Sequence, residues 1–137
     1  MILFSVDVAT IRKVLRDSKT IAVVGLSPKP HRPSHQVASY LMEVGYTIIP
    51  VNPGQDAILG QTCYPNLRAI PTPVDMVDIF RKPETILPIV EDAIAIDARF
   101  IWMQEGIVHE EAAAKAKAAG LLVIMDRCTK IDHMSLV

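Results

Sequence analysis

Hydroxyl and cationic side chains lie close together in residues 25–34, which read Gly-Leu-Ser-Pro-Lys-Pro-His-Arg-Pro-Ser. The hydroxyls belong to Ser27 and Ser34, and the cations to Lys29 and Arg32. These groups donate hydrogen bonds to phosphate oxygens, and free backbone N–H groups at the start of a helix add further donors. The segment therefore predicts a phosphate-binding loop. The alternative interpretation is a solvated basic loop.

The loop stands between a predicted strand and a predicted helix. Residues 21–24 are all apolar and end at Gly25, as expected of a parallel strand buried on both faces. Ser34 stands where an N-cap belongs, and apolar residues recur at helical spacing as far as Gly45. Residues 46–51 form a second apolar run. We therefore predict a β-α-β unit whose loops lie at the carboxyl ends of the strands, where open α/β sheets bind ligands.

Two features of a dinucleotide-binding turn are missing. Only the first glycine of the G-x-G-x-x-G fingerprint is present, as Gly25, and prolines stiffen the loop. The second strand ends at Asn52 and Pro53, where NAD enzymes place an acidic residue on the ribose 2′-hydroxyl. Without that carboxylate, and with Lys29 and Arg32 available, the pattern favours an adenine nucleotide with an additional phosphate. CoA and NADP both fit, and the residues alone do not distinguish them.

The remaining pattern predicts further strands and helices. Apolar runs predict strands over residues 74–80, 99–103 and 121–125, with a short edge strand over residues 61–64. Spacing and composition predict helices over residues 8–15, from residue 83 onward and over residues 109–119, with one further turn over residues 66–70. Pro88 is expected to kink or split the helix that starts near Pro83. The fold class is α/β, a single Rossmann-like, doubly wound and mainly parallel sheet with helices on both faces.

Polar and aromatic residues follow each later strand, so they should meet the loop along one crevice. Phe80 and Arg81 are expected to flank an adenine by stacking and by charge. Asn52 and Pro53 would line the adenosine end. Cys128 lies at the carboxyl end of the last strand. The alternative for Phe80 is an ordinary core aromatic residue.

Several motifs together resemble the small stand-alone CoA-binding proteins. They are Gly25-x-Ser27-x-x-Pro30-x-Arg32-x-Ser34, Pro50-Val51-Asn52-Pro53, Phe80-Arg81, Trp102-Met103-Gln104-x-Gly106 and Asp126-Arg127-Cys128. That family is related to the CoA-binding domain of succinyl-CoA synthetase and to the N-terminal domain of ADP-forming acyl-CoA synthetases. The resemblance runs from about Thr20 to about His133. It implies a Rossmann-like fold that holds coenzyme A across the carboxyl edge of its sheet, with Gln104 and Gly106 facing the pantetheine arm.

The composition agrees with one such domain. The chain has 137 residues, of which 50% are hydrophobic, and a mean hydropathy of +0.30, as expected of a parallel sheet covered on both faces. We expect a single domain over residues 1–137, with an N-terminal helix within 1–19 and a core over 20–133. The net charge of −1 provides no basic field for nucleic acid. No apolar run reaches the ~18–20 residues of a membrane span. The first residues also lack the basic region of a signal peptide, so we expect a cytoplasmic protein.

Thiols and imidazoles offer little further chemistry. Cys63 and Cys128 are too few for a disulfide scaffold and form no C-x-x-C pair, so neither zinc nor thioredoxin-like chemistry is expected. Cys128 could form a mixed disulfide with the CoA thiol if Arg127 lowers its pKa, and its alternative is a small buried side chain. His31 and His35 do not share a helical face, because a proline lies between them. We expect no metal.

No complete catalytic set is recognisable in the sequence. It contains no nucleophile elbow, Walker loop or Ser-His-Asp candidate. Asp75 and Asp78 would point to opposite faces of one strand, so we interpret them as structural. The leading hypothesis is a module that binds CoA or an acyl-CoA as a carrier, sensor or partner. The alternatives are an NADP-dependent oxidoreductase, a small acyl-CoA-handling enzyme using Cys128, and an interaction module with a vestigial pocket. An oligomer and a protein partner stay open.

Overall fold

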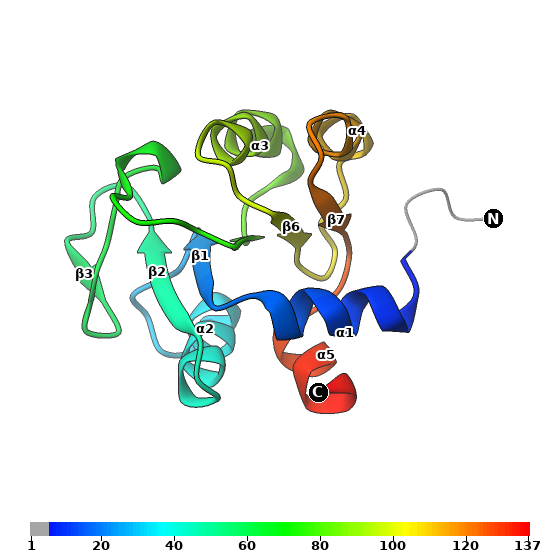
Figure 1. Ribbon diagram of the computed structural model, residues 1–137. Helices are drawn as coiled ribbons and strands as arrows, with labels where there is room; N and C mark the ends of the chain where they lie inside the picture. The colour runs from blue at the N-terminus through cyan, green and yellow to red at the C-terminus, as the bar shows by residue number, and fades with distance from the viewer. Residues whose placement is uncertain (1–5) are drawn as a thin grey trace.

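A parallel five-stranded sheet in the order β2-β1-β5-β6-β7 forms the centre of the computed structural model, which describes residues 6–137 (Figure 1). The strands are β1 (Thr20–Val24), β2 (Thr47–Val51), β5 (Met76–Ile79), β6 (Phe100–Met103) and β7 (Leu122–Ile124). The chain runs outward from β1 to β2 and returns to β5 on the other side of β1. The order therefore reverses between β1 and β5, which is where doubly wound folds bind ligands. Residues 1–5, where we expect no signal peptide, lie outside the described residues.

Helices cover both faces of the sheet, which confirms the predicted fold class (Figure 1). One layer contains α1 (Val8–Asp17), α2 (Pro33–Glu43) and α5 (Thr129–Leu136). The opposite layer contains α3 (Ile86–Ala95) and α4 (Glu110–Ala118), with a 3-10 turn η1 (Leu67–Ala69). Alternate strand residues face the two layers, so Val23 packs with the first and Val24 with the second. In the described residues, none of these helices is long and apolar enough to span a membrane.

The start of α2 differs from the prediction. Arg32 is the N-cap and Pro33 is the first helical residue, so Ser34 lies inside the helix. Proline is favoured at the first helical position because its missing N–H has no partner there anyway. The Ser34 hydroxyl accepts a hydrogen bond from the backbone N–H of Ser27 at 2.9 Å. Ser34 thus fastens the phosphate-loop candidate to the helix.

Pro88 does not split a helix, contrary to the prediction, because α3 (Ile86–Ala95) continues through it. A 3-10 turn, η2 (Pro83–Thr85), leads directly into α3. Pro88 is the third residue of α3, where a backbone N–H would have no partner within the helix. Its missing donor is therefore harmless, and the change from 3-10 to α geometry occurs before it.

Two smaller elements complete the chain. The predicted edge strand over residues 61–64 is shorter, and pairs as β4 (Gln61–Thr62) with β3 (Ala57–Ile58) in an antiparallel hairpin outside the main sheet. The C-terminal helix α5 was not predicted. It packs beside α1, where the guanidinium Nε of Arg12 donates to the carbonyl oxygen of Leu136 at 2.8 Å (Figure 1).

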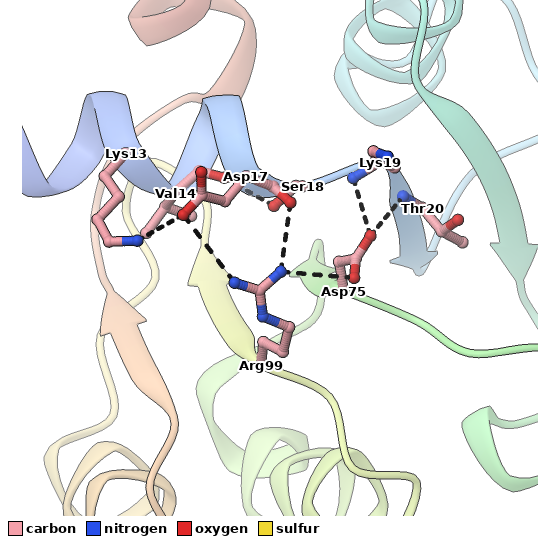
Figure 2. Close-up of polar contacts among 8 residues, drawn as sticks. All are labelled: Lys13, Val14, Asp17, Ser18, Lys19, Thr20, Asp75 and Arg99. Atoms are coloured by element: carbon pink, nitrogen blue, oxygen red, sulfur yellow. Dashed lines mark hydrogen bonds and ion pairs between the residues drawn. The ribbon is translucent and has the colours of Figure 1, made fainter.

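Polar contacts fasten α1 to the amino edge of the sheet (Figure 2). The Asp75 carboxylate accepts hydrogen bonds from the backbone N–H groups of Lys19, at 2.8 Å, and Thr20, at 3.0 Å. The Arg99 guanidinium lies 3.8 Å from the Asp75 carboxylate and donates to the carbonyl oxygen of Asp17 at 3.3 Å. Asp75 therefore makes structural contacts at the amino edge of the sheet, opposite the loops that follow the strands.

Candidate functional site

A cavity of about 900 Å³ lies at the carboxyl edge of the sheet. Its walls come from the loops after β1, β5, β6 and β7 and from the start of α2. The structure brings together in its lining most of the residues singled out from the sequence: Gly25, Ser27, Lys29, Arg32, Ser34, Phe80, Arg81, Gln104 and Cys128. Since the strands are parallel, their carboxyl ends meet at one edge and gather residues that are distant in sequence.

Three of the residues singled out from the sequence lie elsewhere. Pro53 lines a second cavity of about 330 Å³, which shares Arg81 with the first. Asn52 and Gly106 are in neither lining. The Asn52 side-chain amide donates to the carbonyl oxygen of Leu26 at 2.9 Å, so it holds the loop after β1. The Gly106 N–H donates to the Asp126 carboxylate at 2.6 Å, which ties the loop after β6 to the one after β7.

The loop after β1 is held by its own hydrogen bonds. Besides the bond from Ser27 to Ser34, the Ser27 hydroxyl accepts from the backbone N–H of Lys29 at 3.1 Å. A ring nitrogen of His35 lies 2.9 Å from the carbonyl oxygen of Ser27, so His35 supports the loop. In the described part of the chain, no group of three or more His, Cys, Asp or Glu residues is arranged to hold a metal ion. Both serine hydroxyls retain a hydrogen for donation to a ligand.

The cations of this site are available to a ligand. Lys29 and Arg32 are exposed, and within the described residues neither makes an ion pair. Arg81 also makes none among those residues, and it stands between the two cavities. Phe80 beside it is partly buried against the helix layer of α1, α2 and α5. Lys82 lines the cavity as well and makes no ion pair with the described residues, so four cations create a local positive potential in a chain with a net charge of −1.

A buried polar cluster underlies the cavity on the β6 and β7 side. The Gln104 amide nitrogen donates to the Asp78 carboxylate at 2.7 Å and to the Thr129 hydroxyl at 2.9 Å. The Thr129 hydroxyl donates to the other Asp78 oxygen at 3.1 Å. Burial raises the pKa of Asp78 to about 7, although the hydrogen bonds from Gln104 and Thr129 act in the opposite direction. Asp78 is thus a fully buried carboxyl group whose pKa lies near neutral pH.

The Cys128 thiol lies in a different environment from the one expected. Burial raises its pKa, and the charges of Asp78 and Glu105 raise it further. The expectation that Arg127 lowers this pKa was wrong. The Arg127 guanidinium is instead bound in two places by the buried Asp132 carboxylate, with Nε–Oδ2 at 2.6 Å and Nη2–Oδ1 at 2.9 Å. The thiol is therefore mainly protonated at neutral pH.

Sequence reasoning missed part of the lining. The additional residues are Pro33, Val37, Lys82, Pro83, Glu105 and Ile107. Each lies within a few residues of a motif singled out from the sequence. Their position close to the carboxyl end of a predicted strand could therefore have indicated that they line the cavity. It also missed Thr129, which the unpredicted start of α5 places beneath Gln104.

Comparisons with known proteins agree with this geometry. The family model described as CoA binding domain matches residues 19–134. The uncharacterized protein YneT of Bacillus subtilis (strain 168) is 44% identical over 125 residues, covering 91% of this chain and 93% of that protein. A solved structure of a hypothetical protein from Pyrococcus horikoshii OT3 has 39% identity and a TM-score of 0.95, covering 99% of this chain and 96% of the other.

A larger enzyme contains a similar segment. The ADP-forming acetate–CoA ligase I of Archaeoglobus fulgidus is 33% identical over 121 residues, which are 80% of this chain and only 18% of the ligase. The chain thus resembles one part of that enzyme. The match of the family model to residues 19–134, together with the parallel sheet and its edge cavity, leads to one conclusion: the chain belongs to the CoA-binding domain family.

Proposed function

We propose that the protein binds coenzyme A or an acyl-CoA in the cavity at the carboxyl edge of the sheet, as a carrier, sensor or partner module. The observation that supports this most directly is the distribution of chemistry along the cavity. Unpaired cations lie at the β1 loop, whereas Gln104, Ile107 and Cys128 lie at the loops after β6 and β7. CoA likewise has phosphates at one end and a long uncharged arm at the other.

Phosphate binding is assigned to the β1 loop. Lys29 and Arg32 supply charge, and the hydroxyls of Ser27 and Ser34 supply neutral donors next to the start of α2. Arg81 is a further cation, placed where the two cavities meet. The residue after β2 is the uncharged Asn52, so no carboxylate stands there to repel a ribose 3′-phosphate. We assign the adenosine end of the ligand to the region of Arg81 and the second cavity, which Pro53 lines.

The pantetheine arm is assigned to the other half of the cavity. A volume of about 900 Å³ lies within the range of small-molecule and cofactor sites. Ile107 offers an apolar contact, Gln104 an amide and Cys128 a thiol at this end. The proposal assigns no catalytic residue, so the bound state would be read by another protein or passed on with the ligand.

Calorimetric titration with CoA, dephospho-CoA and NADPH tests the proposal. We expect micromolar binding of CoA, about −8 kcal/mol. Dephospho-CoA and the variant Arg32→Ala should each weaken binding about tenfold or more, because each removes one side of a charged contact. Arg16→Ala is the matched control, since Arg16 is exposed on α1 and away from the cavity lining.

The other outcomes are also informative. Preferential binding of NADPH would replace the proposal with the oxidoreductase alternative. Absence of binding to all three ligands would favour an interaction module with a vestigial pocket. Equal binding of CoA by wild type and Arg32→Ala would contradict the phosphate assignment while leaving the CoA site in place.

A further inference from the structure

Two buried residues, Asp78 and Thr129, hold the Gln104 side chain by hydrogen bonds. Asp78 and Thr129 have no exposed surface, and Gln104 is only 4% exposed. The amide nitrogen of Gln104 donates one hydrogen to Asp78 and the other to Thr129, at 2.7 and 2.9 Å. The Thr129 hydroxyl, having accepted from Gln104, donates its own hydrogen to Asp78 at 3.1 Å. Every hydrogen in this cluster is thus used in one consistent arrangement when Asp78 is ionised.

The amide oxygen of Gln104 remains available. It accepts no hydrogen bond from the described residues. Every fully buried side-chain nitrogen or oxygen atom of those residues has a hydrogen-bond partner, so the Gln104 oxygen is not fully buried. This oxygen is therefore open to the cavity that Gln104 lines. A carbonyl oxygen at this position accepts hydrogen bonds and cannot donate them.

We propose that Asp78 and Thr129 are positioning residues that hold the Gln104 amide with its oxygen toward the cavity, so that the site selects an amide N–H of the ligand there. The chemical class of the ligand rests on the proposed function, because the pantetheine arm contains two secondary amides. Turning the amide of Gln104 by half a revolution would present its NH₂ group instead. The site would then face a ligand N–H with another donor, and the contact would be lost.

Protonation of Asp78 removes the reason for this orientation. An ionised carboxylate only accepts hydrogen bonds, so it requires the NH₂ group of Gln104 to point toward it. A protonated Asp78 can donate to the Gln104 oxygen in the turned amide. Burial places the pKa of Asp78 at about 7, so both forms exist near neutral pH. CoA affinity should therefore fall on acidification through this range.

The surroundings of Asp78 contain few competing charges. Its neighbours on the adjacent strands are Val23 and Trp102, which do not titrate. From α1, the buried side chains on this face are apolar. Three ionisable groups on α2 and α5 have hydrogen-bond partners of their own. His35 is bonded to Ser27, Asp132 to Arg127 and His133 to Tyr40. Cys128 and Glu105 remain, and the Cys128 thiol has a raised pKa, so it is neutral in this range.

Hydrogen exchange of the side-chain amide reports its orientation without any ligand. In ¹⁵N-labelled protein at pH 8, the NH₂ protons of Gln104 should exchange at least about tenfold more slowly than those of the exposed Gln61, because both are hydrogen-bonded. Their chemical shifts should titrate near pH 7, and Asp78→Asn should abolish this titration. Thr129→Val should accelerate exchange and Thr129→Ser should restore it. Exchange at the rate of Gln61, without titration, would overturn the proposal.

Calorimetry then tests the selection of the ligand. Between pH 8 and pH 6, wild type should lose about fivefold more CoA affinity than Asp78→Asn, which shares the titration of the CoA phosphates but not that of the carboxyl group. At pH 8, Thr129→Val should weaken CoA binding about fivefold, and Thr129→Ser should recover it. The same pH dependence in wild type and Asp78→Asn would overturn the selection. Should Asp78→Asn fail to fold, the Thr129 pair still decides the question.

The two proposals fail in different ways. Absence of CoA binding would overturn the proposed function and the ligand assigned to the Gln104 oxygen. The exchange measurement on ligand-free protein decides separately whether Asp78 and Thr129 hold the amide. Slow exchange of Gln104 together with no CoA binding would thus leave the positioning role intact and reject CoA as the ligand.

Discussion

A Cβ atom on Gly25 would lie only 2.4 Å from the carbonyl oxygen of Phe80. Real Cβ atoms do not approach a backbone oxygen so closely, and neither Gly25 nor Phe80 can move freely, because each directly follows a strand of the sheet. Gly25 also has a φ of +88°, which other residues adopt at a cost. The first glycine of the phosphate-loop candidate is therefore required by the contact between the ends of β1 and β5, whatever ligand the cavity holds.

Gly25→Ala is expected to lower the free energy of unfolding by about 2–5 kcal/mol, the sum of overlap and backbone strain. Gly54→Ala is the matched control. Gly54 has a similar φ of +85° but no heavy atom within 4 Å of the added Cβ, so it should lose only about 1–2 kcal/mol. Urea unfolding of both variants measures the difference. Equal losses would show that the contact with Phe80 relaxes freely.

Asp78 should make stability decrease as the pH rises. Its pKa is about 7 in the folded protein, raised by burial from 3.8. The folded state therefore binds the proton more tightly than the unfolded state, and stability falls between about pH 4 and pH 7. Wild type should lose about 2–3 kcal/mol relative to Asp78→Asn between pH 5 and pH 8. Denaturant unfolding of both proteins at both pH values measures this difference. An equal change in the free energy of unfolding for wild type and Asp78→Asn would contradict the assignment.

The sequence predicted the sheet and its layers because buried parallel strands are continuous apolar runs, such as residues 21–24 and 46–51, which became β1 and β2. It failed at α5 for a physical reason. In that helix the polar residues Thr129 and Asp132 are buried, whereas Ile131 and Met134 are 52% and 63% exposed. This reverses the usual amphipathic signal, so the periodicity does not mark a helix.

The site was predicted in outline because parallel strands end at one edge. The sequence did not predict in which direction each side chain points. Asn52 follows β2 as expected, yet its amide binds Leu26 instead of lining the cavity. Arg127 is next to Cys128 in sequence but reaches Asp132 one helical turn further on. Such choices depend on which buried partner is available, and that information is spread over residues far apart in the chain.

The ion pair between Arg127 and Asp132 should contribute to the docking of α5. The Asp132 side chain is 6% exposed and the Arg127 side chain 43%. Arg127→Ala leaves a nearly buried carboxylate without its partner, so we expect a loss of about 1–3 kcal/mol, reduced from the fully buried case by solvent at the arginine. Adding Asp132→Asn to Arg127→Ala should recover part of this loss by removing the unpaired charge. Urea unfolding of the single and double variants tests it, and an equally unstable double variant would contradict this explanation.

The two cysteines should respond differently to an occupied cavity. Burial raises the pKa of both thiols, so each should react slowly with iodoacetamide at pH 7.5. Only Cys128 lines the cavity, whereas Cys63 is buried and its thiol points to the carbonyl oxygen of Asn52, 3.5 Å away. Saturating CoA should therefore slow alkylation of Cys128 and leave Cys63 unchanged, as measured by peptide mass spectrometry. If CoA bound while the alkylation rate of Cys128 stayed the same, the pantetheine arm would have to lie away from the end of β7. Slower alkylation of both cysteines would instead indicate a general tightening of the protein, because the two thiols share no wall of the cavity.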